Sequence, residues 1–190
     1  MSKRTIYLGV VLALGLGVFG YFAGTAQSRP ARQDQATSPV SNLGLHLVGV
    51  HVIKEAPDRQ YVAHHYCQEL QEDLIQCAVF DSGAPGARLI DVEYVVGDEA
   101  YRSFSPEEQQ QYWHPHDYEV DGGLLQAPEL PPEQARALLS KIRNTHGRTW
   151  HLWAAKEDPY PLGKPELVWS ITGPGQLREE IERQLEQGRR

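Results

Sequence analysis

Four short segments rich in apolar and β-branched residues follow one another between residues 46 and 96, and their close spacing limits the folds open to the chain. They cover residues 46–53, 61–67, 74–80 and 88–96. Runs of this length and composition are typical of β-strands, and the turn-forming stretch 81–86 separates the last two. Because such short connections do not allow the crossover that parallel neighbours need, the pattern predicts an antiparallel meander.

Two helices are predicted after this meander. Ser105 can cap a short helix whose first turn contains Pro106, and Glu108 stands where it would complete a capping box. A longer helix begins near residue 131, and Gly147 is expected to follow its last turn as a stop signal. One face of that helix carries apolar residues at helical spacing, namely Ala135, Leu138, Leu139 and Ile142.

Later apolar segments at residues 149–155 and 167–172 predict two more strands. Together these elements indicate a single α+β domain over residues 43–173, with an antiparallel sheet and two or three flanking helices. The tail, residues 174–190, is predicted to be a charged amphipathic helix. We expect its narrow apolar stripe to dock on the domain; the stripe consists of Leu177, Ile181 and Leu185.

The N-terminal segment, residues 1–26, has the pattern of an export signal. Lys3 and Arg4 precede an uncharged apolar run at residues 6–23, and small residues follow up to Ala26. The run is longer than in most cleaved signals and close to the ~20 residues that cross a bilayer. We therefore expect a hydrophobic helix that anchors the chain in a membrane, with the domain outside the cytoplasm. The alternative is cleavage after Ala26, which would release a secreted domain.

Composition excludes one class of partner. The chain has 190 residues, of which 41% are hydrophobic, and it carries a formal net charge of −7. Nucleic acid is a poor partner for such a chain, because neutralising phosphates with basic residues drives that binding. Residues 27–42 are polar and contain almost nothing large and apolar, so they are predicted to be a linker between the anchor and the domain.

Several motifs between residues 61 and 163 carry a family resemblance. They lie at residues 64–67, 76–82, 87–94, 113–120, 123–125, 145–150 and 161–163. In these motifs the chain resembles the oil body-associated proteins of plants and their bacterial relatives, which are mostly domains of unknown function. The resemblance implies association with a lipid surface at most, and it supplies no catalytic residues.

Four of the eight histidines stand in two short motifs. His114 and His116 would point to one side of an extended segment, so they could grip one divalent ion such as zinc. His65 and Glu119 are predicted to complete this metal site. The alternative is that the histidines are partly buried and hydrogen-bonded to polar neighbours. Weaker candidates for ligand binding are His64, Glu93, Arg88 and Arg148.

The two cysteines would lie opposite each other in a hairpin centred on residue 72. Export would favour a disulfide between Cys67 and Cys77, which would add about 2.5–3 kcal/mol by the chain-entropy argument. Two buried thiols, or two metal ligands, are the alternatives.

Two functions are compatible with these features. The first is an exported, membrane-tethered binding or structural module that handles lipid or a small ligand. The second is a metal-dependent, hydrolase-like enzyme that uses the histidine cluster. A module would show an exposed apolar groove, whereas an enzyme needs a pocket in which the histidines converge. Neither a Gly-x-Ser-x-Gly elbow nor a phosphate-binding loop is present in the sequence.

Overall fold

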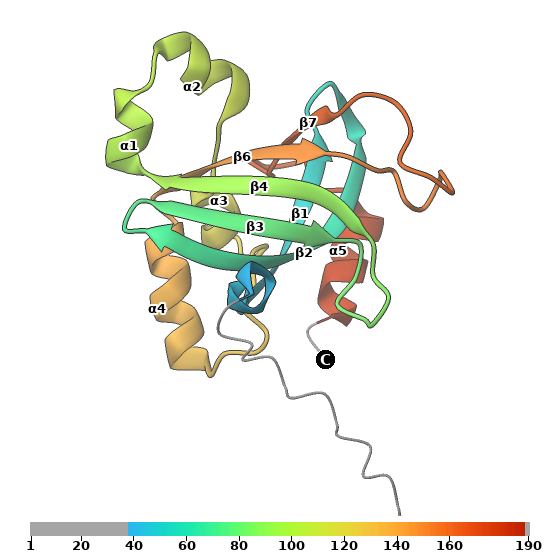
Figure 1. Cartoon of the computed structure of the whole chain (residues 1–190), viewed down its shortest axis with the longest axis horizontal. Helices are drawn as coiled ribbons and strands as arrows, with labels where there is room; N and C mark the ends of the chain where they lie inside the picture. The colour runs from blue at the N-terminus through green and yellow to red at the C-terminus, as the bar shows by residue number, and fades with distance from the viewer. Residues whose placement is uncertain (1–37, 189–190) are drawn as a thin grey trace, which may run out of the picture. The chain divides into compact units, whose positions relative to one another are not determined.

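The domain is built around a closed antiparallel barrel of six strands (Figure 1). The computed structural model describes residues 38–188. Neighbouring strands follow the order β4-β3-β2-β1-β7-β6, and pairing of β4 with β6 closes the ring, while the two-residue β5 extends the sheet beyond β6. The strands are β1 (Leu45–Ile53), β2 (Ala56–Gln71), β3 (Leu74–Phe80), β4 (Leu89–Gly97), β5 (His114–Pro115), β6 (Thr145–His151) and β7 (Glu166–Trp169).

Alternation along the strands decides which side chains enter the barrel. In the β1–β2 pair, Leu47 stands opposite His65, and Gly49 stands opposite Ala63. Because successive side chains point to opposite faces, His65 enters the barrel while its neighbour His64 faces outward. All residues of β1 after Leu45 are buried, since one face of this strand lines the barrel and the other is covered.

Helix α5 (Glu179–Gln187) provides that cover. Ile181 and Leu185 are buried with Val48 and Val50 of the outer face of β1. Burying each of these side chains contributes roughly 1.5–3 kcal/mol. The prediction that the C-terminal stripe docks on the domain is confirmed.

The other helices lie in the long excursion between β4 and β6. Ser105 caps α2 by accepting a hydrogen bond from the Glu108 backbone N–H at 3.2 Å, as the sequence predicted. Helix α4 packs Ile142 against the apolar cluster around Leu47, at the left end of the barrel in Figure 1. The elements are α1 (Asp98–Ser103), α2 (Pro106–Tyr112), α3 (Asp117–Asp121) and α4 (Pro132–Ile142), and a short 3₁₀ helix, η2 (Pro39–Asn42), precedes β1.

The prediction of an antiparallel α+β domain is confirmed, and four details of it are corrected. The sheet closes into a barrel, and residues 43–173 contain four α-helices rather than two or three. Gly147 does not stop a helix: α4 ends at Ile142, and Gly147 lies within β6, facing the barrel interior. β6 also begins at Thr145, four residues before the predicted strand, because the turn after α4 is short.

The predicted N-terminal hydrophobic helix and most of the predicted linker lie outside the described residues. Within residues 38–188, no helix has the length and apolar character needed to cross a membrane.

Candidate metal centre

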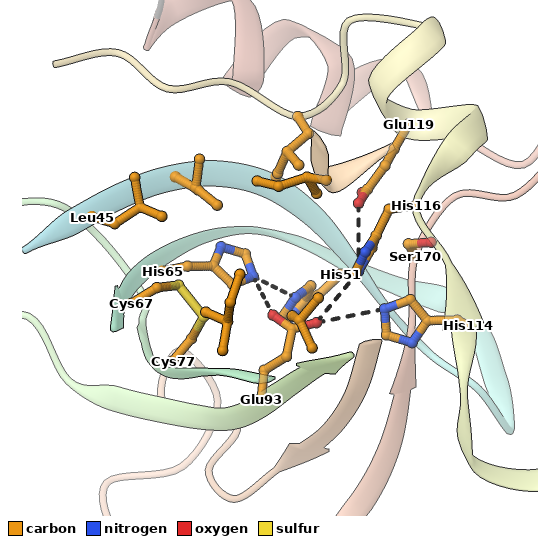
Figure 2. Close-up of a pocket in the computed structure, with 16 residues that line it drawn as sticks. Leu45, His51, His65, Cys67, Cys77, Glu93, His114, His116, Glu119 and Ser170 are labelled. Atoms are coloured by element: carbon orange, nitrogen blue, oxygen red, sulfur yellow. Dashed lines mark hydrogen bonds and ion pairs between the residues drawn. A yellow bond between two sulfur atoms is a disulfide. The ribbon is translucent and has the colours of Figure 1, made fainter. Parts of the chain in front are cut away.

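Five side chains from four parts of the fold converge inside the barrel (Figure 2). β1, β2 and β4 each contribute one, and the segment that forms β5 and leads into α3 contributes two. Each of the five residues is 1–5% exposed. They are His51, His65, Glu93, His114 and His116.

Two triads share the carboxylate of Glu93. On one side, His65 Nε2 lies 3.2 Å from Glu93 Oε2 and 2.9 Å from His51 Nε2. On the other side, His114 Nε2 and His116 Nε2 lie 3.6 and 3.8 Å from Glu93 Oε1. Within each triad all ligand atoms lie within 4.8 Å of one another. Two ligands that each stand about 2.0–2.1 Å from a tetrahedral ion are separated by about 3.3 Å, so this spacing suits a metal.

Gly147 leaves space at the point where the second triad converges. A Cβ atom built on this glycine would lie 2.5 Å from Glu93 Oε1 and 2.7 Å from Nε2 of both His114 and His116. Any other residue at this position would therefore collide with three potential ligand atoms at once. The absence of a side chain at Gly147 therefore allows these three atoms to converge.

Outer hydrogen bonds fix the tautomers of two of the imidazoles. Asp91 Oδ2 lies 2.7 Å from His51 Nδ1, which donates to it. His116 Nδ1 lies 2.8 Å from Thr145 Oγ1, whose own proton goes to the Ile142 carbonyl at 2.6 Å. Because Nδ1 carries the proton in both rings, both Nε2 lone pairs face the centre, which is the usual arrangement around a bound metal.

The other two imidazoles lack such support. Within residues 38–188, the buried Nδ1 atoms of His65 and His114 have no hydrogen-bond partner. Glu93 receives a further hydrogen bond from the Thr149 hydroxyl at 2.9 Å, which fixes the orientation of its carboxylate.

Electrostatics keep the central carboxylate ionised. Burial by itself would raise the pKa of Glu93, but interactions with His116 and His65 outweigh it and hold this pKa well below its usual range. Burial and the neighbouring His116 lower the pKa of His114 well below its usual range, so this ring is neutral. An ionised carboxylate and neutral imidazoles are the forms that bind a metal. This donor set suits zinc, iron, manganese or copper better than calcium or magnesium.

Glu119 lies beside the triads without belonging to either. Its Oε1 stands 4.0 Å from His116 Nε2, and its carboxyl group lines the same cavity. Burial raises the pKa of Glu119 to about 7. This carboxyl group is therefore placed to exchange a proton near neutral pH.

The cavity around these groups is small. Its volume is about 30 Å³, which accommodates an ion and a water molecule and is too small for an acyl chain or a sugar. Its lining also includes apolar side chains and the Cys67–Cys77 disulfide, which is visible at the left of Figure 2. The two cysteines pair directly across β2 and β3, in the register expected for the hairpin.

The structure brings together most of the residues that the sequence singled out for a metal. His65, His114 and His116 converge as predicted, and Glu119 lies next to them. Glu93, which the sequence suggested only as a weak ligand, is the carboxylate that both triads share. His51 was not among the predicted ligands, although it lies two residues after Gly49 on the face of β1 that also carries Leu47.

The remaining weak candidates lie outside the barrel. His64 Nδ1 is 3.2 Å from His46 Nε2 on the outer surface. Arg88 pairs with Asp81 at 2.8 Å, and Arg148 pairs with Glu108 at 2.8 Å. Both arginines therefore form ion pairs on the outer surface.

Comparison with known proteins identifies the family. The family described as "Protein of unknown function (DUF1264)" matches residues 37–189. Oil body-associated protein 1A of Zea mays is 38% identical over 148 residues, which cover 77% of this chain and 62% of the relative. Oil body-associated protein 2A of Arabidopsis thaliana is 37% identical over 137 residues, covering 72% and 55%.

The chain thus spans less than two thirds of the length of these relatives. No solved structure matches it. The family match covers all of the described residues, 38–188, and thus every strand of the barrel. The chain belongs to the DUF1264 family, together with the oil body-associated proteins of plants.

Proposed function

We propose that this protein binds one divalent transition-metal ion inside its barrel. Glu93, His114 and His116 hold the ion next to Gly147, and His65 and His51 complete the shell from the opposite side. The observation that carries the proposal is the convergence of the buried ligand atoms of Glu93, His114 and His116, which all lie within 4.8 Å of one another. The Asp91–His51 and Thr145–His116 hydrogen bonds support it, because they turn two Nε2 lone pairs toward that point.

Metal analysis of matched variants tests the proposal. The untagged full chain, expressed with each metal supplied in turn, is expected to contain about one ion per chain. His65→Ala and the double change at His114 and His116 are expected to lose it. His64→Ala is the matched control, because the adjacent imidazole faces outward and its removal leaves the centre intact. Equal metal content in the His64 and His65 variants, or no metal in any preparation, would refute the proposal.

A metal-dependent hydrolase is a second candidate. Glu119 favours it, because this buried carboxyl group lies beside the centre without being needed in either triad. A bound ion would supply a Lewis acid and lower the pKa of a water molecule, and Glu119 would accept the proton of that water. Glu119→Gln is expected to retain the ion and lose hydrolysis of small activated esters. Retained hydrolysis in this variant would exclude the role of Glu119.

Lipid association remains a candidate for the outer surface of the barrel. A shallow apolar groove of about 650 Å³ runs over β3, β4 and β6, and Tyr94 within it is 45% exposed. The rest of the apolar lining is Leu74, Val96, Ala100, Phe104, Trp113 and Trp150. The names of the plant relatives refer to oil bodies. Flotation of the chain with triacylglycerol droplets, lost on Tyr94→Glu but not on Tyr160→Glu, tests this role.

We also propose that the domain lies outside the cytoplasm, tethered by the N-terminal apolar segment. It would be periplasmic if the source is a Gram-negative bacterium. The Cys67–Cys77 disulfide supports this location, since disulfides persist in oxidising compartments. Protease protection of the domain in intact cells, followed by loss of protection after permeabilisation of the outer envelope, tests it.

A further inference from the structure

The cavity around the metal centre has room for more than an ion. Its volume is about 30 Å³. A single water molecule needs roughly 10–15 Å³ of such space, and an ion takes up about as much. The space that remains beside the ion therefore holds a molecule of about two non-hydrogen atoms.

The proposed donor set leaves one coordination position free for such a molecule. Glu93, His114 and His116 fill three of the four positions of a tetrahedral ion. If His51 and His65 also bind, five of the six positions of an octahedral ion are filled. In both cases a single position remains, so the outside ligand binds the ion through one atom.

Apolar side chains line the part of the cavity away from His114 and His116. In Figure 2, Leu45 and the disulfide lie to the left of the central imidazoles, and His114 and His116 lie to the right. The apolar lining consists of Leu45, Leu47, Ile75, Val95, Leu125 and Ile142. Because these side chains offer no hydrogen bonds, this part of the cavity favours a weakly hydrated molecule over a charged one.

A second hollow lies directly outside this apolar part, beside α4. Its volume is about 290 Å³. Four residues line both the hollow and the cavity, and their side chains form the partition between the two: Leu45, Ile75, Val95 and Ile142. Rotamer changes in this partition let a small apolar molecule pass, whereas a charged molecule would first have to lose its hydration.

The ion itself does not depend on repeated use of this passage. It binds once, and a rarer local opening of the domain is enough to admit it. A ligand that exchanges has to pass while the barrel is closed. The size and the apolar character of the passage therefore select the ligand rather than the metal.

Building on the metal site proposed above, we propose that a neutral diatomic molecule, of the class that includes dioxygen and nitric oxide, binds the ion at its free position. It enters through the partition beside α4, in which Ile142 is the residue that α4 contributes. Such a molecule binds through d electrons that the metal shares with it, so iron fits this role and zinc, with its filled d shell, does not.

Nitric oxide is the probe, added to the full chain loaded with ferrous iron in the absence of air. Iron content and the optical and paramagnetic spectra are measured on one sample. Nitric oxide is expected to bind saturably, at about one molecule per ion. Imidazole, whose ring is too large for the remaining space, and azide, which is charged, are expected to leave the rate of nitric oxide binding unchanged.

The outcomes separate this inference from the metal site on which it rests. An iron-loaded chain that shows no nitrosyl spectrum, or in which imidazole or azide slows nitric oxide binding, would overturn the diatomic ligand and leave the metal site in place. A chain that takes up zinc but not iron would do the same. A chain that takes up no metal at all would overturn both.

Variants of Ile142 test the passage. Ile142→Ala widens the partition, and nitric oxide is expected to bind on the order of tenfold faster, which corresponds to a barrier lower by about 1.4 kcal/mol. Ile142→Val removes a single carbon atom, so it preserves the fold more safely and should give an intermediate rate. Ile181→Ala is the matched control, because this similarly buried isoleucine lies on α5 against the outer face of β1. Equal rates in the unchanged chain and both Ile142 variants would overturn the passage beside α4.

Discussion

Replacing Gly147 by alanine provides the sharpest perturbation of the metal centre. The new Cβ would stand 2.5 Å from Glu93 Oε1 and 2.7 Å from Nε2 of His114 and His116. These contacts are too short for a carbon atom, so the methyl group would push the three ligand atoms out of the positions from which they could share an ion about 2.0–2.2 Å away. We expect the variant to bind less than a tenth of the metal that the unchanged chain binds.

The expected change in thermal stability follows from linkage. An ion present at 100 times its dissociation constant stabilises the folded state by about 2.7 kcal/mol. For a domain of this size each kcal/mol raises Tm by about 2–4 °C, so saturating metal should raise Tm by about 5–11 °C. The shift should vanish in Gly147→Ala, whose metal-free form is itself destabilised by about 1–3 kcal/mol of overpacking.

Gly44→Ala is the matched control for this experiment. A Cβ at Gly44 meets no atom within 4 Å, so this variant should keep both the bound metal and the metal-dependent rise in Tm. Scanning calorimetry with and without chelator, combined with elemental analysis, measures both quantities. Full metal content in Gly147→Ala would show that the ion does not lie between Glu93 and the two histidines, and it would refute the reasoning.

Three further predictions concern the same centre. Asp91→Asn should lower metal affinity about 10–100-fold, measured by competition with a coloured chelator, because His51 loses the carboxylate that fixes its tautomer; unchanged affinity would exclude His51 as a ligand. Metal should be released as pH falls. Burial alone would lower the pKa of His116, but the neighbouring carboxylates raise it above its ordinary value of 6.5, so protons should begin to displace the ion above pH 6.5. Retention of the ion at pH 5 would contradict this prediction. Ile142 lines both the cavity and a second hollow beside α4, so its truncation should open a path between them. Ile142→Ala should therefore release metal to a chelator faster than Ile181→Ala does, although the two isoleucines are similarly buried, at 5% and 6% exposed.

Local patterns in the sequence predicted most of the strands and the two capped or amphipathic helices. The segment 74–80 coincides with β3, and the cap at Ser105 lies where it was expected. These features depend on neighbouring residues alone, namely alternation, turns and capping. Closure of the barrel depends on pairing between β4 and β6, which are separated by residues 98–144, and no local pattern reports such a pairing.

The same distinction explains what was missed at the metal centre. His114 and His116 stand together in the sequence, so their shared direction could be predicted. His51 lies in β1, where residues on both faces are buried because α5 covers the outer face. The sequence of this strand therefore shows no alternation of polar and apolar residues that would mark His51 as facing inward. Gly147 was predicted to be a helix stop because it follows an amphipathic segment. Its actual role is to let three ligand atoms approach the backbone of β6, and those atoms come together only when the barrel is closed.

The pairing of β4 with β6 also sets the order of events during folding. Glu93 lies on β4, and His114 and His116 lie in the connection between β4 and β6 that this pairing, the seam of the barrel, closes. Bringing such distant segments together is entropically slow, so the seam should form late. The ion would then find its full set of ligands only after the rate-limiting step. Metal should therefore slow unfolding and leave the refolding rate nearly unchanged.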